Sequence, residues 1–252
     1  EMCIRDSSLT GRDKGKERDR KLSALLEGKI HILIGTHAVF QSGVHFLDLR
    51  LAIIDEQHRF GVRQRLALGE KGQSVDVLVM TATPIPRSLA LSQYGEMDLT
   101  VLTDKPAGRK PVKTVIISDN RVNEIVLKLK KAIDKKNQAY WVCPLIEESE
   151  VLDYTAAEDR FKALRANLGE GEVGLVHGQM NSDEKDEVMK KFSEGEIKVL
   201  VSTTVIEVGV DVPSANIIVI EHAEKFGLAQ LHQLRGRVGR GTSESSCILL
   251  YK

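Results

Sequence analysis

The sequence predicts an α/β protein with two parallel-sheet domains, and three observations support that prediction. Short apolar runs alternate with amphipathic stretches along most of the 252 residues. Several of these runs end in polar residues, as strands of a parallel sheet do when a binding site lies along their carboxyl ends. Residues 105–111 interrupt the alternation with two prolines, a glycine and three basic residues, a composition typical of a linker. We therefore predict two domains, residues 1–108 and 109–252.

Composition excludes several classes of protein. Hydrophobic residues make up 42% of the chain and charged residues 29%, which fits a globular protein and not a disordered one. Aromatic residues are only 4%, so stacking on nucleic-acid bases is not expected to be a main binding mode. Cys3, Cys143 and Cys247 are too far apart for a metal-binding motif and indicate a reducing compartment. No apolar run approaches the length of a membrane span, so no membrane partner is expected.

In the first half we expect one helix and three strands. The helix is predicted at residues 15–27, with Gly28 closing it, and the strands at 30–34, 52–54 and 75–80. Residues 1–8 match no element. The strand at 52–54 is uniformly apolar, which predicts burial on both faces.

In the second half strand and helix alternate more regularly. Ser182 is expected to cap one helix, which Gly195 ends. The other helices are predicted at residues 120–133 and 156–168. The predicted strands are residues 112–117, 138–142, 172–176, 198–202, 216–220 and 247–251.

Two adjacent acids follow the second strand. Asp55 and Glu56 come directly after the apolar residues Ala52, Ile53 and Ile54, at the edge where ligands bind in such sheets. One carboxylate can hold a hydrated Mg²⁺ while the other orients or deprotonates a water molecule. A strand that ends in a solvated acidic turn is the alternative, and for any isolated pair of acids it would be favoured.

Five stretches occur in series, and together they support a functional interpretation more strongly than any one of them does alone. They are residues 35–37, 55–58, 81–84, 202–212 and 233–240. In this order they resemble the motifs of the superfamily 2 helicases and translocases. Details within residues 54–65, 81–87 and 205–213 resemble the branch that remodels stalled replication forks. The resemblance covers nearly all of residues 9–252 and implies two RecA-like domains that use ATP and Mg²⁺.

The resemblance implies roles for the first-half motifs. Asp55 is the residue expected to bind Mg²⁺ through water, and Glu56 the residue that activates the attacking water. Gln57 and His58 are expected to relay the state of the γ-phosphate toward Thr81 and Thr83. A core histidine and two turn hydroxyls are the structural alternatives for His58 and the two threonines.

The second-half motifs are expected to complete the nucleotide site. Gln233, Arg237 and Arg240 resemble the residues that supply arginine fingers, and we expect the two arginines, at i and i+3, to lie on one helical face. Gly209 and Asp211 are expected to contact the nucleotide or its ribose. A solvated basic turn is the alternative for the arginines, although Gly236, Gly239 and Gly241 favour close backbone approach.

Six residues occupy positions that in this superfamily meet the nucleic-acid backbone. Hydroxyls and backbone amides suit phosphates without reading bases. The candidates are Thr10, Gly11, Thr36, His37, Thr203 and Thr204. A surface turn is nearly as good an account of the first two.

The chain also departs from the family pattern. It contains no Gly-x-x-x-x-Gly-Lys-Ser/Thr loop, the element that holds ATP phosphates in such motors. We therefore expect it to be a piece of a larger protein, to have a first domain incomplete at its N-terminus, and to be inactive alone. Residues 1–7 fit the family poorly and are expected to be foreign sequence.

These observations lead to one main functional hypothesis and two alternatives. The main one is a fragment of an ATP-dependent double-stranded DNA translocase that remodels stalled forks and Holliday junctions in repair and recombination. The expected partners are ATP and branched DNA, with a single-stranded-DNA-binding protein as a further candidate. The protein is expected to be a monomer in the bacterial cytoplasm, associated with the nucleoid. The alternatives are the motor of a transcription–repair coupling translocase and an inactive nucleic-acid-binding module.

Overall fold

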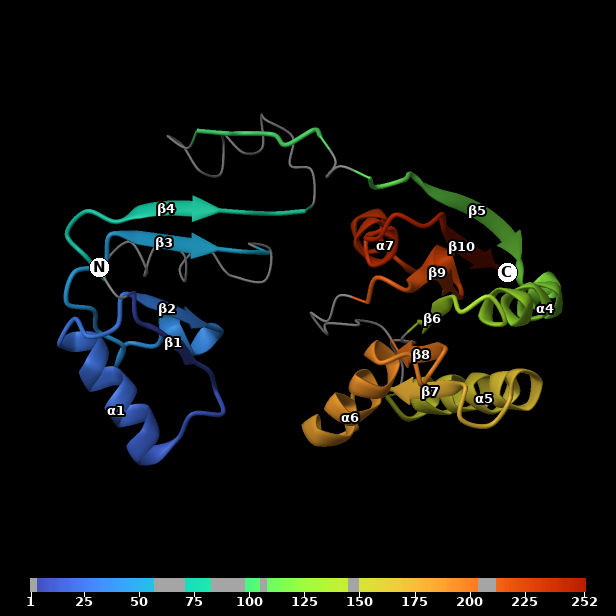
Figure 1. Ribbon diagram of the computed structural model, residues 1–252, viewed down its shortest axis with the longest axis horizontal. Helices are drawn as coiled ribbons and strands as arrows, with labels where there is room; N and C mark the ends of the chain where they lie inside the picture. The colour runs from blue at the N-terminus through green and yellow to red at the C-terminus, as the bar shows by residue number, and fades with distance from the viewer. Residues whose placement is uncertain (1–3, 57–70, 83–97, 105–107, 145–149, 204–211) are drawn as a thin grey trace. The chain divides into compact units, whose positions relative to one another are not determined.

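The chain divides into two compact units, Glu1–Pro86 and Arg87–Lys252. The computed structural model (Figure 1) describes residues 4–56, 71–82, 98–104, 108–144, 150–203 and 212–252. Residues 98–104 and 108–111 contain no helix or strand. The predicted boundary after residue 108 lies in this stretch and stays a prediction.

The first unit contains two small parallel sheets. One pairs β1 (Asp6–Leu9) with β2 (Ile32–Gly35), and the other pairs β3 (Leu51–Ile54) with β4 (Asp76–Val79). Helix α1 (Gly15–Leu26) connects β1 to β2, and a short 3-10 helix, η1 (His37–Phe40), follows β2. The helix and the three strands predicted for this half are confirmed.

The strand β1 was not predicted. No element was assigned to residues 1–8, because Asp6, Ser7 and Ser8 are polar and give no strand pattern. The structure forms a strand there through backbone pairing with β2, in register from Asp6 opposite Ile32 to Leu9 opposite Gly35. Only Leu9 carries an apolar side chain into the core, where it is 1% exposed. Pairing with a neighbour therefore made a strand that the side chains do not specify.

Helix α1 ends as its sequence predicts. Gly28 has a φ of +69°, the left-handed conformation that glycine adopts without cost. Its amide donates to Leu25 O at 3.2 Å, and the Lys29 amide donates to Ala24 O at 2.9 Å. Leu25 is thereby held in the small core that also contains Leu9.

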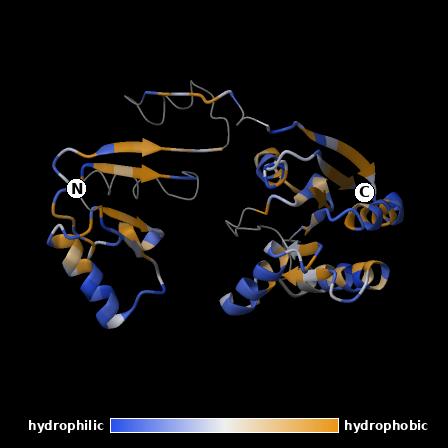
Figure 2. Cartoon of the chain, viewed as in Figure 1, coloured by the Kyte–Doolittle hydropathy of each residue, from blue (hydrophilic) through white to orange (hydrophobic). Residues whose placement is uncertain are grey.

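The prediction that residues 52–54 are buried on both faces is wrong for the described part of the chain. Ala52 and Ile54 are buried, but Leu51 is 54% exposed and Ile53 57% exposed. Side chains alternate between the two faces of a strand, and one face only is packed here, against a partly buried group of apolar residues. Figure 2 shows β3 and β4 as largely hydrophobic ribbons.

The second unit is built on a six-stranded parallel sheet with the strand order β5-β10-β9-β6-β8-β7 (Figure 1). The strands are β5 (Val112–Ser118), β6 (Gln138–Cys143), β7 (Val173–Val176), β8 (Val199–Thr203), β9 (Ala215–Ile220) and β10 (Ser245–Tyr251). The helices are α4 (Val122–Ile133), α5 (Glu150–Leu168), α6 (Ser182–Ser193) and α7 (Leu228–Arg235), with 3-10 helices η3 (Asp119–Arg121) and η4 (Ala223–Lys225). Every strand predicted for this half is confirmed.

Helices cover both faces of this sheet. The core on one face contains residues of α4 and α5 together with Trp141 and Val201, and the core on the other contains residues of α6 and α7 together with Tyr140 and Leu200. The chain runs from β5 through β6 to β7 in one direction and then returns, so right-handed crossovers place the two pairs of helices on opposite faces. All six residues of β6 are buried.

The cap of α6 differs from the prediction by one residue. Asn181, and not Ser182, is the capping residue: its side chain accepts from the Glu184 amide at 2.8 Å. The Glu184 carboxylate accepts in return from the Asn181 amide at 3.2 Å. This reciprocal pair satisfies two amides that a helix start leaves open, which a serine one residue further along cannot do. Gly195, at a φ of +78°, ends the helix as predicted.

Within the part of the chain that the structure describes, no helix is long and apolar enough to cross a membrane.

We expect limited proteolysis to remove the first unit before the second. Two-stranded sheets with exposed apolar residues open more readily than a six-stranded sheet packed on both faces. A protease time course followed by mass spectrometry should show fragments that begin near residue 111 outlasting all fragments of residues 1–86. Earlier cleavage within β5, β6 or β8 would contradict this order of stability.

Candidate nucleotide and DNA sites

The acidic pair lies at the carboxyl edge of the β3–β4 sheet. Ile54 is the last residue of β3 and pairs with Val79, and the Met80 amide donates to Ile54 O at 2.8 Å. Asp55 and Thr81 therefore leave the sheet at the same edge. Asp55 is exposed, whereas Thr81 is half-buried. The structure brings together two stretches that are 26 positions apart by number, as parallel pairing predicts.

A strained turn joins the two acids. Glu56 has a φ of 50°, in the left-handed region that costs a non-glycine residue about 1 kcal/mol or more. Its amide donates to Asp55 Oδ1 at 2.8 Å. This bond holds the Asp55 carboxylate against the backbone of its neighbour. Non-glycine residues in such conformations are concentrated at functional sites, and no sequence pattern indicated this one.

The residues at this edge fit Mg²⁺ that arrives with a nucleotide. In the described part of the chain, no group of three or more His, Cys, Asp or Glu side chains could hold a metal. Mg²⁺ in phosphate-transfer sites needs no such group, because one or two carboxylates, water and the phosphates themselves supply its oxygen ligands. An exposed Asp55 beside Glu56 is a donor set of that kind.

Two of the predicted DNA-contact stretches meet at the carboxyl edge of the β1–β2 sheet. Leu9 pairs with Gly35, and the Thr36 amide donates to Leu9 O at 3.3 Å. Gly11, Thr36 and His37 are exposed and Thr10 is half-buried. The structure thus places these four candidates along one accessible edge.

Asp13 organises the turn after β1, and sequence reasoning missed it. Its Oδ2 accepts from the Thr10 amide at 2.7 Å and from the Thr10 hydroxyl at 3.1 Å, while its Oδ1 accepts from Lys21 Nζ. The hydrogen bond from Lys21, with that from the Thr10 amide, lowers the pKa of Asp13 to about 2. The spacing Thr-x-x-Asp, typical of side chains that bond nearby amides, was the available signal.

This turn changes what Thr10 can contribute. A hydroxyl has a single hydrogen, and Thr10 Oγ1 gives it to Asp13 while accepting from the Arg12 amide at 3.3 Å. The Thr10 hydroxyl therefore cannot also donate to a phosphate oxygen. The exposed backbone at Gly11 is the better placed donor within this turn.

The two glycines of this edge have different roles. A Cβ added at Gly35 would lie 2.5 Å from Leu9 O, so the close approach of β1 and β2 excludes any side chain there. A Cβ added at Gly11 would meet nothing within 4 Å. Packing therefore requires Gly35, whereas Gly11 leaves open space beside the chain.

In the second unit, the two predicted arginines do not lie on a helix. Helix α7 ends at Arg235, so Gln233 is helical but Arg237 and Arg240 belong to the turn that follows. Gly236 caps the helix, and Gly239 has a φ of +77°. A Cβ added at Gly239 would lie only 2.6 Å from Val112 Cγ2, so a side chain does not fit there. The expectation of one helical face is wrong because the helix ends at Arg235, before both arginines. Arg240 instead bonds Gly236 O through Nε at 3.3 Å.

Thr203 ends β8 and is 7% exposed, opposite Cys143 of β6. The edge beside it carries a network that sequence reasoning did not identify: Glu221, directly after β9, accepts from Trp141 Nε1 and from Arg160 Nε. The Arg160 guanidinium also lies 5.4 Å from the centre of the Trp141 ring. This network fixes the end of β9, from which the chain continues to α7.

Six other predicted residues lie outside the described part of the chain: Gln57, His58, Thr83, Thr204, Gly209 and Asp211.

Comparison with known proteins assigns each half of the chain to a helicase domain. Residues 3–91 match the DEAD/DEAH box helicase model, and residues 120–242 match the helicase conserved C-terminal domain. ATP-dependent DNA helicase RecG of Escherichia coli strain K12 is 54% identical over 249 residues, which are 97% of this chain and 36% of that protein. RecG of Thermotoga maritima is 52% identical over 243 residues, 96% of this chain and 31% of that protein. The chain belongs to the RecG family of helicases.

Solved structures agree with this family. A structure of RecG bound to a three-way DNA junction matches with a TM-score of 0.75 and 47% identity, over 100% of this chain and 32% of that one. The helicase Lhr of Mycobacterium smegmatis, bound to single-stranded DNA and AMP-PNP, matches with a TM-score of 0.70 at 18% identity, which shows the fold alone. The prediction of RecA-like parallel-sheet domains is thereby confirmed. The chain spans about a third of the length of the RecG relatives that it matches.

Replacing Gly35 by alanine should destabilise the first unit of this RecG-family chain. The added methyl group overlaps Leu9 O, and such overpacking costs about 1–3 kcal/mol. Gly11→Ala is the matched control and should change stability by less than about 0.5 kcal/mol. Amide hydrogen exchange of β1 and β2, read by mass spectrometry, measures both; equal protection in the two variants would contradict the distinction.

Proposed function

We propose that this chain is part of the motor of an ATP-dependent helicase that moves along double-stranded DNA and remodels branched DNA, including stalled forks and Holliday junctions. The observation that carries the proposal is the strained Asp55–Glu56 turn beside Thr81, at the carboxyl edge of parallel strands in a RecG-family chain. The matched relatives carry the name RecG, which favours this role over the transcription–repair coupling motor.

In the proposed reaction, the residues of the acidic turn divide two tasks. Asp55 would hold Mg²⁺ through water, and the bound ion would supply positive charge that neutralises the phosphates. Glu56 orients the attacking water and accepts its proton. The turn supports this division because the Glu56 amide donates to Oδ1 of Asp55 and so fixes the position of that carboxylate. Thr81 and Thr83, with Gln57 and His58, transmit the presence of the γ-phosphate.

The arginine turn of the second unit supplies the remaining positive charge. Arg237 and Arg240 are proposed to stabilise the phosphoryl group in transfer, with Gln233, Gly209 and Asp211 as further nucleotide contacts. Support comes from the two glycines that hold this turn, since Gly239 fits only without a side chain. Arginines on a fixed turn lose less conformational freedom when they bind a phosphate than arginines on a mobile segment.

Within the first unit, DNA is proposed to bind along the exposed edge formed by Gly11, Thr36 and His37, with Thr10 shaping that edge through its bonds to Asp13. Thr203 and Thr204 are proposed as separate DNA contacts of the second unit. The contacts would be to the phosphate backbone and therefore independent of sequence, as movement along DNA requires. The related structure of RecG with a three-way junction supports branched DNA as the substrate. We further propose a monomer in the bacterial cytoplasm near the nucleoid, with a single-stranded-DNA-binding protein as partner, since the relatives named above are bacterial.

In the full-length protein, Glu56→Gln should keep nucleotide binding and lower ATP turnover by roughly 10²-fold or more, because the amide cannot accept a proton. Glu27→Gln, at an exposed residue paired with Lys29, is the control and should leave turnover unchanged. ATP hydrolysis with branched DNA measures both. The 252-residue chain alone should show no hydrolysis, since it contains no phosphate-binding loop; near-normal turnover by the Glu56 variant would refute the assignment.

Arg240→Ala in the full-length protein should reduce ATP turnover by roughly 10³-fold if the side chain acts as an arginine finger. The control is Lys190→Ala, at an exposed cation on α6 that lies 3.9 Å from Glu194. Circular dichroism should show both variants folded. A loss of secondary structure that parallels the loss of turnover would instead support a structural role for Arg240.

A further inference from the structure

Lys71 holds a turn of the first unit that lies directly after η1. Its Nζ donates to Gln41 O at 2.8 Å and to Val44 O at 2.7 Å. The Val44 amide donates to Gln41 O at 3.1 Å, so the lysine bonds the first and last residues of a closed four-residue turn. The residue is half-buried, and burial lowers the pKa of Lys71. A donor that reaches two carbonyls at once fixes the position of this turn, because hydrogen bonds are directional.

The same turn ends η1, the short helix that carries His37. Gln41 caps η1 at its C-terminal end. The Gln41 side chain accepts in addition from Arg18 Nη2 of α1 at 2.7 Å. Lys71 and Arg18 thus hold the end of η1 from two different segments of the chain. Because Thr36 and His37 belong to the edge proposed for DNA, the bonds that fix η1 also fix that edge.

The side chains of η1 contact both small sheets of the first unit. Val39 packs against the core that contains Leu9 and also against the core that contains Ile54. Phe40 packs against the second of these cores. The residue after Ile54 is Asp55, the first residue of the acidic turn. One short helix therefore touches the sheet of the DNA edge and the sheet of the acidic turn.

Lys71 reaches η1 from the sheet of the acidic turn. It stands directly before Gly72, in the segment that leads into β4. A Cβ added at Gly72 would lie 2.7 Å from Leu49 O, so this segment passes close to the chain that enters β3. The Asp76 amide at the start of β4 donates to Arg50 O at 2.9 Å. The lysine therefore extends from the β3–β4 sheet to the end of η1, and its hydrogen bonds add to the apolar contacts between them.

We infer that Lys71 is a positioning residue that couples DNA contact to ATP hydrolysis. By holding η1 on the β3–β4 sheet, it makes a displacement of Thr36 and His37 by DNA move the acidic turn as well. Apolar contacts are not directional and allow η1 to slide over the sheet, whereas bonds to two carbonyls fix its position. The inference rests on the proposed function, because the coupling it assigns belongs to that motor.

Three variants of the full-length protein test this inference. Lys71→Met removes the charge and the donor hydrogens while keeping a long side chain, and Lys71→Arg keeps the charge and donors. Lys29→Met is the control, at an exposed lysine of the same unit that pairs with Glu27. ATP turnover is measured without DNA and with a saturating synthetic three-way DNA junction, and the melting temperature of each variant is measured in parallel.

We expect Lys71→Met to lower the ratio of DNA-stimulated to DNA-free turnover by at least roughly fivefold. DNA-free turnover should be unchanged, because the acidic turn itself stays intact. Lys71→Arg should restore most of the ratio, and Lys29→Met should match the unmodified protein. An unchanged ratio in Lys71→Met would overturn the inference. So would an equal loss of both turnovers with a lower melting temperature, which would show that Lys71 only stabilises the fold.

Amide hydrogen exchange tests the same coupling without ATP hydrolysis. In the unmodified full-length protein, adding the junction should change the exchange of a peptide that contains Asp55 and Glu56. In Lys71→Met that change should be lost although the junction still binds; a change that persists would refute the role of Lys71. An unmodified protein that DNA does not stimulate would refute the proposed function and the coupling with it, whereas equal stimulation of the unmodified protein and Lys71→Met refutes the coupling alone.

Discussion

Parallel pairing of strands is the interaction on which both candidate sites depend. Parallel neighbours end at the same edge of a sheet, so residues distant in the chain are brought together wherever two such strands finish. Asp55 and Thr81 meet in this way beyond β3 and β4, and Gly11 and Thr36 meet beyond β1 and β2. Neither pair of residues needs a side-chain contact to lie close together. Backbone hydrogen bonds between the two strands place them there, which explains why polar residues in β1 do not prevent the arrangement.

Close approach of backbone segments is the second constraint. Gly35 lets β1 lie against β2, and Gly239 lets the arginine turn lie against β5. In both places an added methyl group would overlap a neighbouring atom, Leu9 O at Gly35 and Val112 Cγ2 at Gly239. The segments that carry candidate functional groups therefore depend on glycines, which allow close packing of the backbone, as well as on hydrogen bonds. Asp13 adds a different kind of control, because it fixes the Thr10 turn and occupies the one hydrogen of its hydroxyl.

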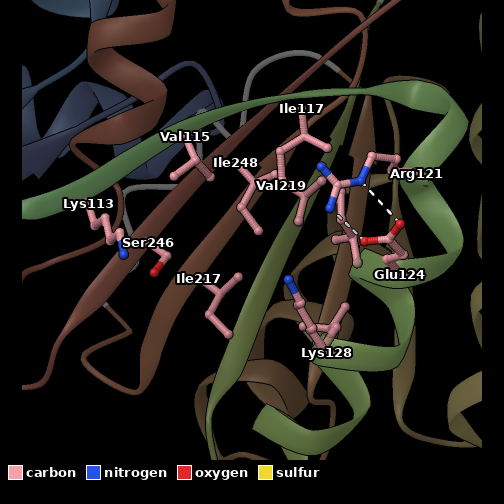
Figure 3. Close-up of a pocket in the computed structure, with 12 residues that line it drawn as sticks. Lys113, Val115, Ile117, Arg121, Glu124, Lys128, Ile217, Val219, Ser246 and Ile248 are labelled. Atoms are coloured by element: carbon pink, nitrogen blue, oxygen red, sulfur yellow. Dashed lines mark hydrogen bonds and ion pairs between the residues drawn. The ribbon is translucent and has the colours of Figure 1, made fainter.

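The two units differ in how completely their apolar residues are covered. β6 and β8 of the second unit are buried along their whole length, whereas Leu51 and Ile53 of the first unit face solvent. Within the second unit the same contrast recurs on a smaller scale, because Val115 of β5 and Ile248 of β10 are only half-buried (Figure 3). Uncovered apolar strand residues have the same physical meaning in both places, because each remains in contact with water that a packed neighbour would exclude.

The sequence by itself determined the fold class, nearly every strand and helix, and the stretches that carry the candidate chemistry. It did so because apolar periodicity and glycine positions are local signals, and because parallel α/β sheets place strand ends together. Tertiary structure alone decided the rest. β1 is a strand only because β2 pairs with it, Asp13 is important only because the turn brings Thr10 to it, and Arg237 lies outside the helix because α7 ends at Arg235. These outcomes depend on neighbours that are distant in the chain, or on which of several competing local hydrogen bonds forms. The periodicity of apolar residues in a sequence gives no information on either.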